Sequence, residues 1–210
     1  MAQDVKPTRS EELRLKERID LAENGHEILE KKRDGLIHEF MEVVGDAQEM
    51  NEELAEIYSK ASEKMKLAKI YDGESAVQAN AMAVKQDTKI QLEAQNIMGV
   101  RVPEIEAENQ LQREILDREY GITSTTSRID SVADKYEELL EKIIEAAETQ
   151  TKILKLLEEI EKTKRRVNAL EHKTIPEMKE ARDEITQVLQ ERSREETFRM
   201  KKIKEMTEEA

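Results

Sequence analysis

The stretch NIMGVRVPEIE, Asn96–Glu106, interrupts two long helical patterns and decides how the chain is organised. Glu, Lys, Leu, Ala and Ile dominate the sequence on either side of it. Gly99, the two valines and Pro103 are poor helix residues, and the valines alternate with polar neighbours. We therefore expect the chain to leave the helical state here and to turn back on itself.

Apolar and polar side chains also alternate in Thr88–Ala94, just before this stretch. Together the two stretches predict a β-hairpin over about residues 88–103, with its turn at Asn96–Gly99. Pro103 cannot donate to a ladder, so it should end the second strand or lie at an edge. Two strands are marginal alone, so we expect the hairpin to lie on a surface through its apolar side chains. These are Ile90, Leu92, Val100 and Val102.

Upstream of the hairpin, a long helical arm is predicted over residues 8–72. Thr8 and Glu11 fit a capping box, and Gly73 is a plausible C-terminal stop. Between them the alternating three- and four-residue spacing of a coiled-coil seam persists for many turns. Its positions are Leu15, Ile19, Ala22, His26, Leu29, Arg33, Leu36, Phe40, Val43, Ala47, Met50, Leu54, Ile57, Ala61, Lys64 and Ala68. We interpret His26 as a packed, hydrogen-bonded seam residue.

A second helical arm is predicted downstream, over residues 126–207. Its seam changes phase near Leu170, and Pro176 should kink the helix near Thr174. Before the phase change the seam comprises Ile129, Val132, Tyr136, Leu139, Ile143, Ala146, Gln150, Ile153, Leu157, Ile160, Lys164 and Val167; after it, Thr174, Met178, Ala181, Ile185 and Val188.

The two arms most simply pair antiparallel around a central segment, residues 73–125. That segment should hold the hairpin, an Ala-rich stretch over residues 74–86 that is either a short helix or a flexible approach, and a short helix over about residues 105–120. The predicted fold class is all-α: a long antiparallel two-helix coiled coil with a small central segment. Parallel pairing between two copies would leave the central segment without an obvious role.

Composition supports this class and excludes several functions. Charged residues form 40% of the 210-residue chain and aromatic residues 3%, which is typical of coiled coils and not of compact globules. The formal charge of −13 argues against nucleic acid as a partner. There is no cysteine, hence no disulfide or thiolate site. No signal peptide or membrane-spanning segment is recognisable, so direct membrane insertion is not expected.

No motif for catalysis, for a cofactor or for a metal is present. The glycines are scattered, so a phosphate-binding loop is not expected, and the three histidines are far apart in sequence. The one local charge anomaly is a basic run near the C-terminus, interleaved with apolar residues. It contains Arg199, Lys201, Lys202 and Lys204 among Phe198, Met200, Ile203 and Met206. It could be an ordinary amphipathic helix end or a docking surface for acidic and apolar loops.

Four stretches resemble the D subunit of the archaeal and vacuolar-type rotary ATP synthases, in the family's order and over nearly the full chain. They are VKPTRSEELRLKERIDLAENGHEILEKKRDGLIHEF at residues 5–40, NIMGVRVPEI at residues 96–105, RRVNALEHKTIPEMKEAR at residues 165–182 and REETFRMKKIK at residues 194–204. The resemblance implies a non-catalytic central-stalk shaft without a cofactor.

The resemblance also implies partners and a location. The helical ends, with Arg9, Arg14, Arg199, Lys201 and Lys202, would enter the hexamer of catalytic and regulatory A and B subunits. The central segment would dock in the C subunit, the adaptor of the membrane rotor. The hairpin would contact the small F subunit of the stalk. The protein would be peripheral, on the cytoplasmic face of the cell membrane.

One alternative comes from another class, because prefoldin-type chaperone subunits also combine two helical arms with β-hairpins. The long, unequal arms and the mixed basic tip at residues 198–204 favour the rotary shaft. A plain coiled-coil spacer would need neither the hairpin nor the break at Pro176.

Overall fold

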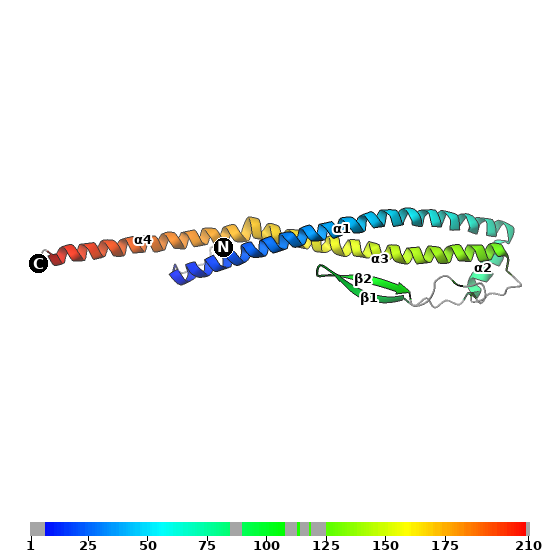
Figure 1. Ribbon diagram of the computed structural model, residues 1–210, viewed down its shortest axis with the longest axis horizontal. Helices are drawn as coiled ribbons and strands as arrows, with labels where there is room; N and C mark the ends of the chain where they lie inside the picture. Colours follow the sequence, from blue (N-terminus) through cyan, green and yellow to red (C-terminus); the bar gives the residue numbers. More distant parts are fainter. Residues whose placement is uncertain (1–6, 85–89, 108–112, 114–117, 119–124, 209–210) are drawn as a thin grey trace. The chain divides into compact units, whose positions relative to one another are not determined.

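The computed structural model describes residues 7–84, 90–107, 113, 118 and 125–208. Long helices dominate it, and its only sheet among these residues is a two-stranded antiparallel hairpin (Figure 1). This confirms the predicted, mostly α-helical fold class. In chain order the elements are α1 (Arg9–Tyr71), α2 (Glu74–Ala83), β1 (Ile90–Ile97), β2 (Val100–Ala107), α3 (Ser127–Ala169), the π-helical turn η2 (Leu170–Thr174) and α4 (Ile175–Glu208).

The chain divides into two compact units, Gly35–Glu159 and a second unit built from Met1–Asp34 and Ile160–Ala210. This division cuts through α1 and α3, whereas the division predicted from the sequence separates two arms from a central segment. The predicted division therefore stays a prediction, although α1 and α2 lie where helices were expected.

The ends of α1 follow the predicted signals. At its start the Oγ1 of Thr8 accepts a hydrogen bond from the backbone N–H of Glu11 at 3.3 Å, which satisfies one of the free donors of the first turn. At its end Gly73 has φ of 89°, a left-handed conformation that glycine adopts without strain. α2 begins directly afterwards, so this glycine turns the chain from one helix into the next.

Within the unit Gly35–Glu159, α1 and α3 run antiparallel, as contacts at successive levels show. Lys64 Nζ donates to Ser131 Oγ at 2.6 Å, and Glu53 pairs with Lys142 at 3.8 Å. As residue numbers fall along α1, those of the partners on α3 rise. Leu36, Ala61 and Ala68 are fully buried on the α1 side of this packing.

The unit Met1–Asp34 with Ile160–Ala210 shows the same antiparallel arrangement between α1 and α4. Lys179 pairs with Glu23 at 2.7 Å, and Arg192 donates to the carbonyl oxygen of Pro7 at 3.3 Å. Leu15, Ile19 and Ile185 are buried here.

Every seam position predicted for α1 is buried or half-buried. His26 is the one position whose chemistry differs from the interpretation. Its Nε2 is buried and has no hydrogen-bond partner among the described residues, and the nearest carboxylate oxygen, on Glu171, is 3.8 Å away. Packing, not a hydrogen bond, holds this side chain.

The seam of α3 departs from the sequence prediction at several positions. Leu156 and Thr163 are buried, and these five predicted positions are exposed instead: Tyr136, Ile143, Gln150, Leu157 and Lys164. The predicted seam and the observed seam both alternate steps of three and four residues, so the spacing alone does not show which of the two is buried. The structure buries a threonine and leaves the lysine ammonium in water, which avoids the larger desolvation cost.

The π-helical turn η2 explains the change of seam phase. Leu170 and Ile175 are half-buried, while residues 171–174 between them are exposed, so the predicted seam position Thr174 is wrong. A step of five residues is one longer than a coiled-coil seam allows, and a π-helical turn absorbs an extra residue. The backbone N–H of Ile175 accordingly donates to the carbonyl of Leu170, five residues earlier. Pro176, which lacks an N–H, follows directly.

The hairpin exists but is displaced relative to the prediction. Its strands pair Ile90 with Ala107 through to Ile97 with Val100, so β2 continues past Pro103. Of the two places predicted for Pro103, the end of the strand is wrong and an edge strand is right, because β2 is an edge of this two-stranded sheet. A helix beginning at residue 105 is also wrong. The rest of that predicted helix, apart from Arg113 and Arg118, lies outside the described residues. The Ala-rich stretch, left open as a helix or a flexible approach, forms α2 up to Ala83.

Pro103 fits inside β2 because of its position in the ladder. Met98 and Gly99 form the turn, with φ of 49° and 87°, the values of a type I′ turn. A two-residue turn makes Ile97 and Val100 a hydrogen-bonded pair, and the pairs then alternate. Pro103 therefore belongs to a non-hydrogen-bonded pair with Ala94, and its missing N–H costs no ladder bond.

Candidate interaction surfaces

The four apolar residues singled out in the hairpin lie on opposite faces of it. Val100 and Val102 are 7% and 1% exposed, whereas Ile90 and Leu92 are 47% and 70% exposed. The register explains the split: Leu92 pairs with Ile105, while Val102 pairs with Gln95 on the other face. Of these four residues, only Ile90 and Leu92 are therefore available to a partner, and the two valines anchor the hairpin within its own unit.

Two contacts attach the hairpin to the long helices of the unit. The backbone N–H of Ile105 donates to Glu148 Oε2 on α3 at 3.0 Å, and Lys152 pairs with the same carboxylate at 2.5 Å. Burial disfavours the charged form of Glu148, but these two interactions outweigh it and hold its pKa below the ordinary range. At the turn, Met98 packs against Gly35 of α1, where a Cβ atom would lie 2.6 Å from the methionine methyl group.

Arg118 is bound to α3 and is the largest fully buried side chain among the described residues, 1% exposed. Its guanidinium donates to both carboxylate oxygens of Glu137 at 3.0 and 2.7 Å. It also donates to Asp134 at 2.5 Å and to the carbonyl of Asp130 at 3.3 Å. A planar guanidinium suits this two-pronged contact better than an ammonium would. The sequence does not predict a role for Arg118, because nothing in its neighbours marks this arginine as buried.

A second polar cluster joins the end of α1 to the start of α3. Asp72 accepts hydrogen bonds from Arg128 at 3.1 and 2.9 Å and from Thr126 Oγ1 at 3.0 Å. The Arg128 hydrogen bonds chiefly hold the pKa of Asp72 below its usual value. Arg128 also lies over the ring of Tyr71, 5.1 Å from its centroid, at cation–π distance.

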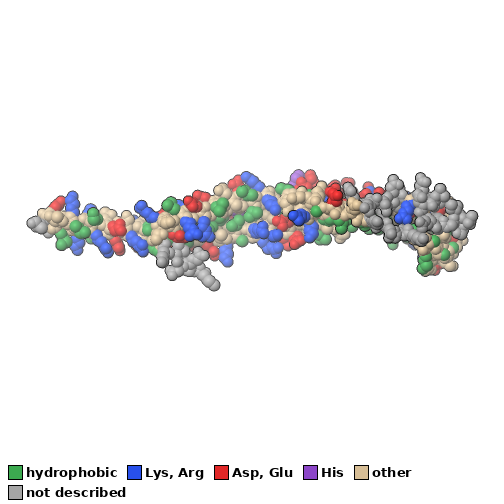
Figure 2. All heavy atoms as spheres, turned by 90° about the horizontal axis from the view of Figure 1, so that it is seen from below, with side chains coloured by type: hydrophobic (Ala, Val, Ile, Leu, Met, Phe, Trp, Pro, Cys, Tyr) green, Lys and Arg blue, Asp and Glu red, His purple; other side chains and the backbone are tan. Residues whose placement is uncertain are grey.

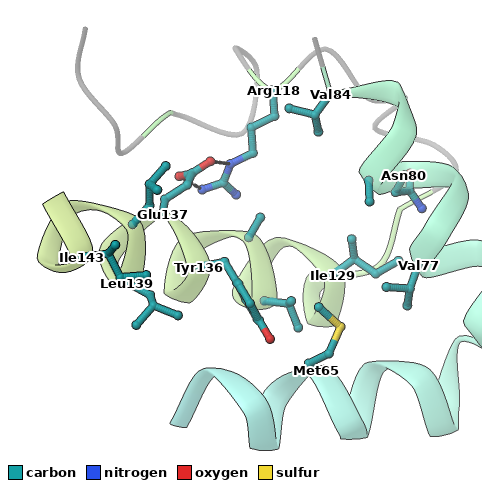
Figure 3. A pocket seen from close by; sticks show the side chains of 14 residues that line it. Met65, Val77, Asn80, Val84, Arg118, Ile129, Tyr136, Glu137, Leu139 and Ile143 are labelled. Carbon is teal, nitrogen blue, oxygen red and sulfur yellow. Dashed lines mark hydrogen bonds and ion pairs between the residues drawn. The ribbon is translucent and has the colours of Figure 1, made fainter. Parts of the chain in front are cut away.

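A cavity of about 550 Å³ opens between α1, α2 and α3 in the same unit (Figure 3). Its walls are mainly apolar, with Met65 from α1, Val77 from α2 and Ile129 from α3. Arg118 and Glu137, joined by their hydrogen bonds, form its polar rim. The volume is in the range of small-molecule or side-chain pockets, but the lining carries no further grouping of polar side chains.

The end of α4 has no helix packed on it within the described residues. Every residue from 190 to 208 is exposed, including Phe198 at 72% and Met200 at 69%. In Figure 2 hydrophobic and charged side chains appear next to each other on this end. The predicted basic residues Arg199, Lys201 and Lys202 all lie on this stretch.

Arg9 and Arg14, predicted at the same tip, are exposed but are not grouped with that basic run. Arg192 contacts Pro7, so the start of α1 lies beside Arg192. Arg199 is seven residues further along α4, roughly 10 Å at the helical rise. Arg14 pairs instead with Glu11 of its own helix at 3.7 Å.

Two further features of the described residues bear on other chemistry. No three of their His, Asp or Glu side chains are grouped as metal ligands would be. Within the described helices, no stretch is long and apolar enough to cross a bilayer.

The chain matches known proteins over almost its whole length. The family model of the ATP synthase D subunit matches residues 11–205. Three relatives, each named as the D subunit of an A-type ATP synthase, come from Haloarcula marismortui, Methanosarcina mazei and Methanoregula boonei, at 48%, 49% and 50% identity. The alignments cover 97%, 96% and 96% of this chain, and 88%, 96% and 96% of the relatives. With these matches and the antiparallel helices and hairpin described above, the chain belongs to the D-subunit family of ATP synthases.

Proposed function

We propose that this chain is the non-catalytic central-stalk rotor subunit of an A-type ATP synthase. In this role it transmits torque between the ion-driven membrane ring and the hexamer that makes or hydrolyses ATP. The observation that carries the proposal is near-full-length similarity to relatives named as D subunits of A-type ATP synthases. The paired helices support it, because a seam buried along two helices resists bending and unwinding better than one helix does.

Control of catalysis would be indirect. The hexamer contains several near-equivalent sites, and a shaft with different faces biases each of them differently. The π-helical turn and the unequal ends of α1 and α4 make the faces of this chain unequal. No residue of the chain needs to touch the nucleotide for this.

The partners follow from the exposed surfaces. The α4 end, with Arg199, Lys201 and Lys202, would lie among loops of the A and B subunits, together with Arg9 and Arg14. The face of Ile90 and Leu92 would meet the F subunit of the stalk. The region of α2 would dock in the adaptor C subunit. The chain would thus be held at the cytoplasmic face of the membrane by its partners.

Observation of rotation tests the main proposal. The chain has no cysteine, so Ser75→Cys, at an exposed position of α2, creates a unique attachment site for a bead. With the hexamer of A and B subunits fixed to a surface, ATP should drive unidirectional rotation of the bead. A stationary bead on a hexamer that hydrolyses ATP normally would refute the rotor role.

The hairpin contact has its own test, with a control inside the same hairpin. Ile90→Ser with Leu92→Ser should weaken binding of the F subunit while the helical circular dichroism stays unchanged. Val102→Ser removes a buried anchoring side chain, so it should destabilise the hairpin. It should weaken binding of the F subunit only as a consequence of that destabilisation. Unchanged affinity for the F subunit in the Ile90 and Leu92 variant would remove this face from the interface.

A further inference from the structure

The two outer edges of the hairpin differ in their backbone chemistry. Non-hydrogen-bonded pairs point their N–H and C=O groups away from the partner strand. On β2 these outward positions include Pro103 and Ile105, and on β1 they include Leu92 and Ala94, their partners in the register. The outward N–H and C=O groups of these four residues therefore determine whether each edge can pair with a further strand.

The outer edge of β2 is closed. Pro103 has no N–H to offer, and the N–H of Ile105 is already bonded to Glu148 of α3 at 3.0 Å. Proline and a covering element are two of the means by which proteins protect strand edges.

Among the described residues, the outer edge of β1 has neither of these two forms of protection. It runs without a bulge from Ile90 to Ile97 and contains neither proline nor lysine. Its side chains are exposed up to Asn96. Within the described part of the chain, no group pairs with the outward N–H and C=O groups of Leu92 and Ala94. An unprotected edge of this length is suited to accepting a further strand.

The side chains along β1 define the chemistry of the strand that would fit. Leu92 is apolar and 70% exposed, so the incoming strand should place apolar side chains beside it. Glu93 points to the other face and lies opposite Glu104 across the hairpin. Two like charges directly opposite are unfavourable, and a basic side chain on the incoming strand would relieve this repulsion.

Charge also argues against a second copy as the occupant. Antiparallel pairing of two β1 edges would bring the two Glu93 side chains opposite or diagonal to each other. It would also join two chains with a formal charge of −13 each.

We propose that the outer edge of β1 docks an extended segment of another protein, which adds as a third strand of the hairpin. That segment carries apolar side chains beside Ile90 and Leu92 and a basic side chain opposite Glu93. The inference goes beyond the rotor role and holds whichever protein supplies the strand.

The test uses the full chain and two fluorescein-labelled peptides, Val-Thr-Val-Lys-Val-Thr-Val and its twin with Glu in place of Lys. Anisotropy should show saturable binding, with the Lys peptide favoured about two- to fivefold, the range of a cross-strand charge pair. Glu93→Lys should reverse that preference. Hydrogen exchange of the outward amides of Leu92 and Ala94 should slow on binding.

Ala94→Pro is the decisive variant, because it removes one outward N–H without breaking a ladder bond of the hairpin. It should weaken binding of both peptides about tenfold. Slow exchange of the ladder amides of Gln95 and Val102 checks that the hairpin is intact; if it is not, the reversal by Glu93→Lys decides alone. Absence of binding at millimolar peptide, equal binding by an intact Ala94→Pro hairpin, no reversal of preference by Glu93→Lys, or self-association of the chain through β1 would each overturn the proposal.

Discussion

At the scale of single residues, polar side chains join segments that are distant in sequence. Asp72, at the end of α1, binds Thr126 and Arg128 at the start of α3. Arg118 binds Asp134 and Glu137 of α3. The sequence alone did not reveal these contacts, because carboxylates and cations are so frequent that no pair stands out.

Asp72→Asn should destabilise the chain in a pH-dependent way. The pKa of Asp72 in the folded chain lies below its value in the unfolded chain, which is about 3.9. The contribution of Asp72 to folding stability is therefore present above about pH 4 and is lost as pH falls through the folded pKa. The difference in Tm between wild type and variant should therefore be full at pH 7 and shrink below about pH 4. Arg128→Gln is the matched control and should give the same profile. A difference independent of pH would contradict the ion pair.

Arg118→Met should destabilise the unit Gly35–Glu159 by about 3 kcal/mol. That is the lower end for a broken buried pair, because the side chain of Asp134 is 61% exposed and water can solvate its charge once the arginine is gone. Chemical denaturation and hydrogen exchange near Glu137 would measure the loss. Arg128→Met serves as a comparison with a half-exposed arginine, and an equal loss from both would argue against the role of burial.

Gly45→Ala should raise the free energy of unfolding by about 0.5–1 kcal/mol, since a Cβ there meets nothing within 4 Å in the middle of α1. Gly35→Ala has the same helical gain, but its Cβ would displace Met98. Its net gain should be smaller, and the methyl resonance of Met98 should shift. Equal gains without such a shift would show that Met98 does not pack on Gly35.

At the scale of elements, the sequence predicted the spacing of the buried seam in each helix. It did not decide which of two seams with the same spacing is buried. The α1 seam was predictable because every heptad supplied apolar residues. In α3, Leu156 and Leu157 satisfy the same spacing, so only packing selects between them. The faces of the hairpin were predictable in principle: once the turn is placed at Met98 and Gly99, the register puts Leu92 opposite Ile105.

The π-helical turn η2 is set by the seam spacing and not by the proline alone. Pro176→Ala should therefore retain the turn and change the free energy of unfolding by less than about 1 kcal/mol, because the helix already accommodates the missing N–H. Deleting Lys173 in the Pro176→Ala background restores a spacing of four between Leu170 and Ile175. A continuous α-helix should result, visible in the amide hydrogen-bond pattern by NMR.

Deletion of Lys155 controls for the loss of a residue as such. It lies in a regular part of α3, where removing one residue rotates every later seam position by about 100°. The control should be strongly destabilised and the Lys173 deletion should not. Persistence of the π-helical turn in the double variant would show that the spacing does not cause it.

At the scale of the whole molecule, charge is distributed so that one helix end differs from the rest. The formal charge is −13, yet Arg199, Lys201, Lys202 and Lys204 follow one another without an acidic residue between them. Exposed Phe198, Met200, Ile203 and Met206 lie among them, at 59–72% exposure. Charged residues keep a helix end soluble, but exposed apolar side chains such as Phe198 gain nothing from contact with water. This composition therefore favours contact with another protein.

Reversing Arg199, Lys201 and Lys202 to Glu should weaken association with the hexamer of A and B subunits about tenfold, because three interface charges each contribute up to about 1 kcal/mol. The effect should diminish at high salt, where such charges are screened. Reversal of Lys66, Lys155 and Arg165, exposed residues on α1 and α3, changes the net charge equally. If affinity measured by surface plasmon resonance falls alike in both triple variants, net charge and not the α4 end governs assembly. A loss confined to the first variant, with ATPase coupling reduced in proportion, would place the α4 end inside the hexamer.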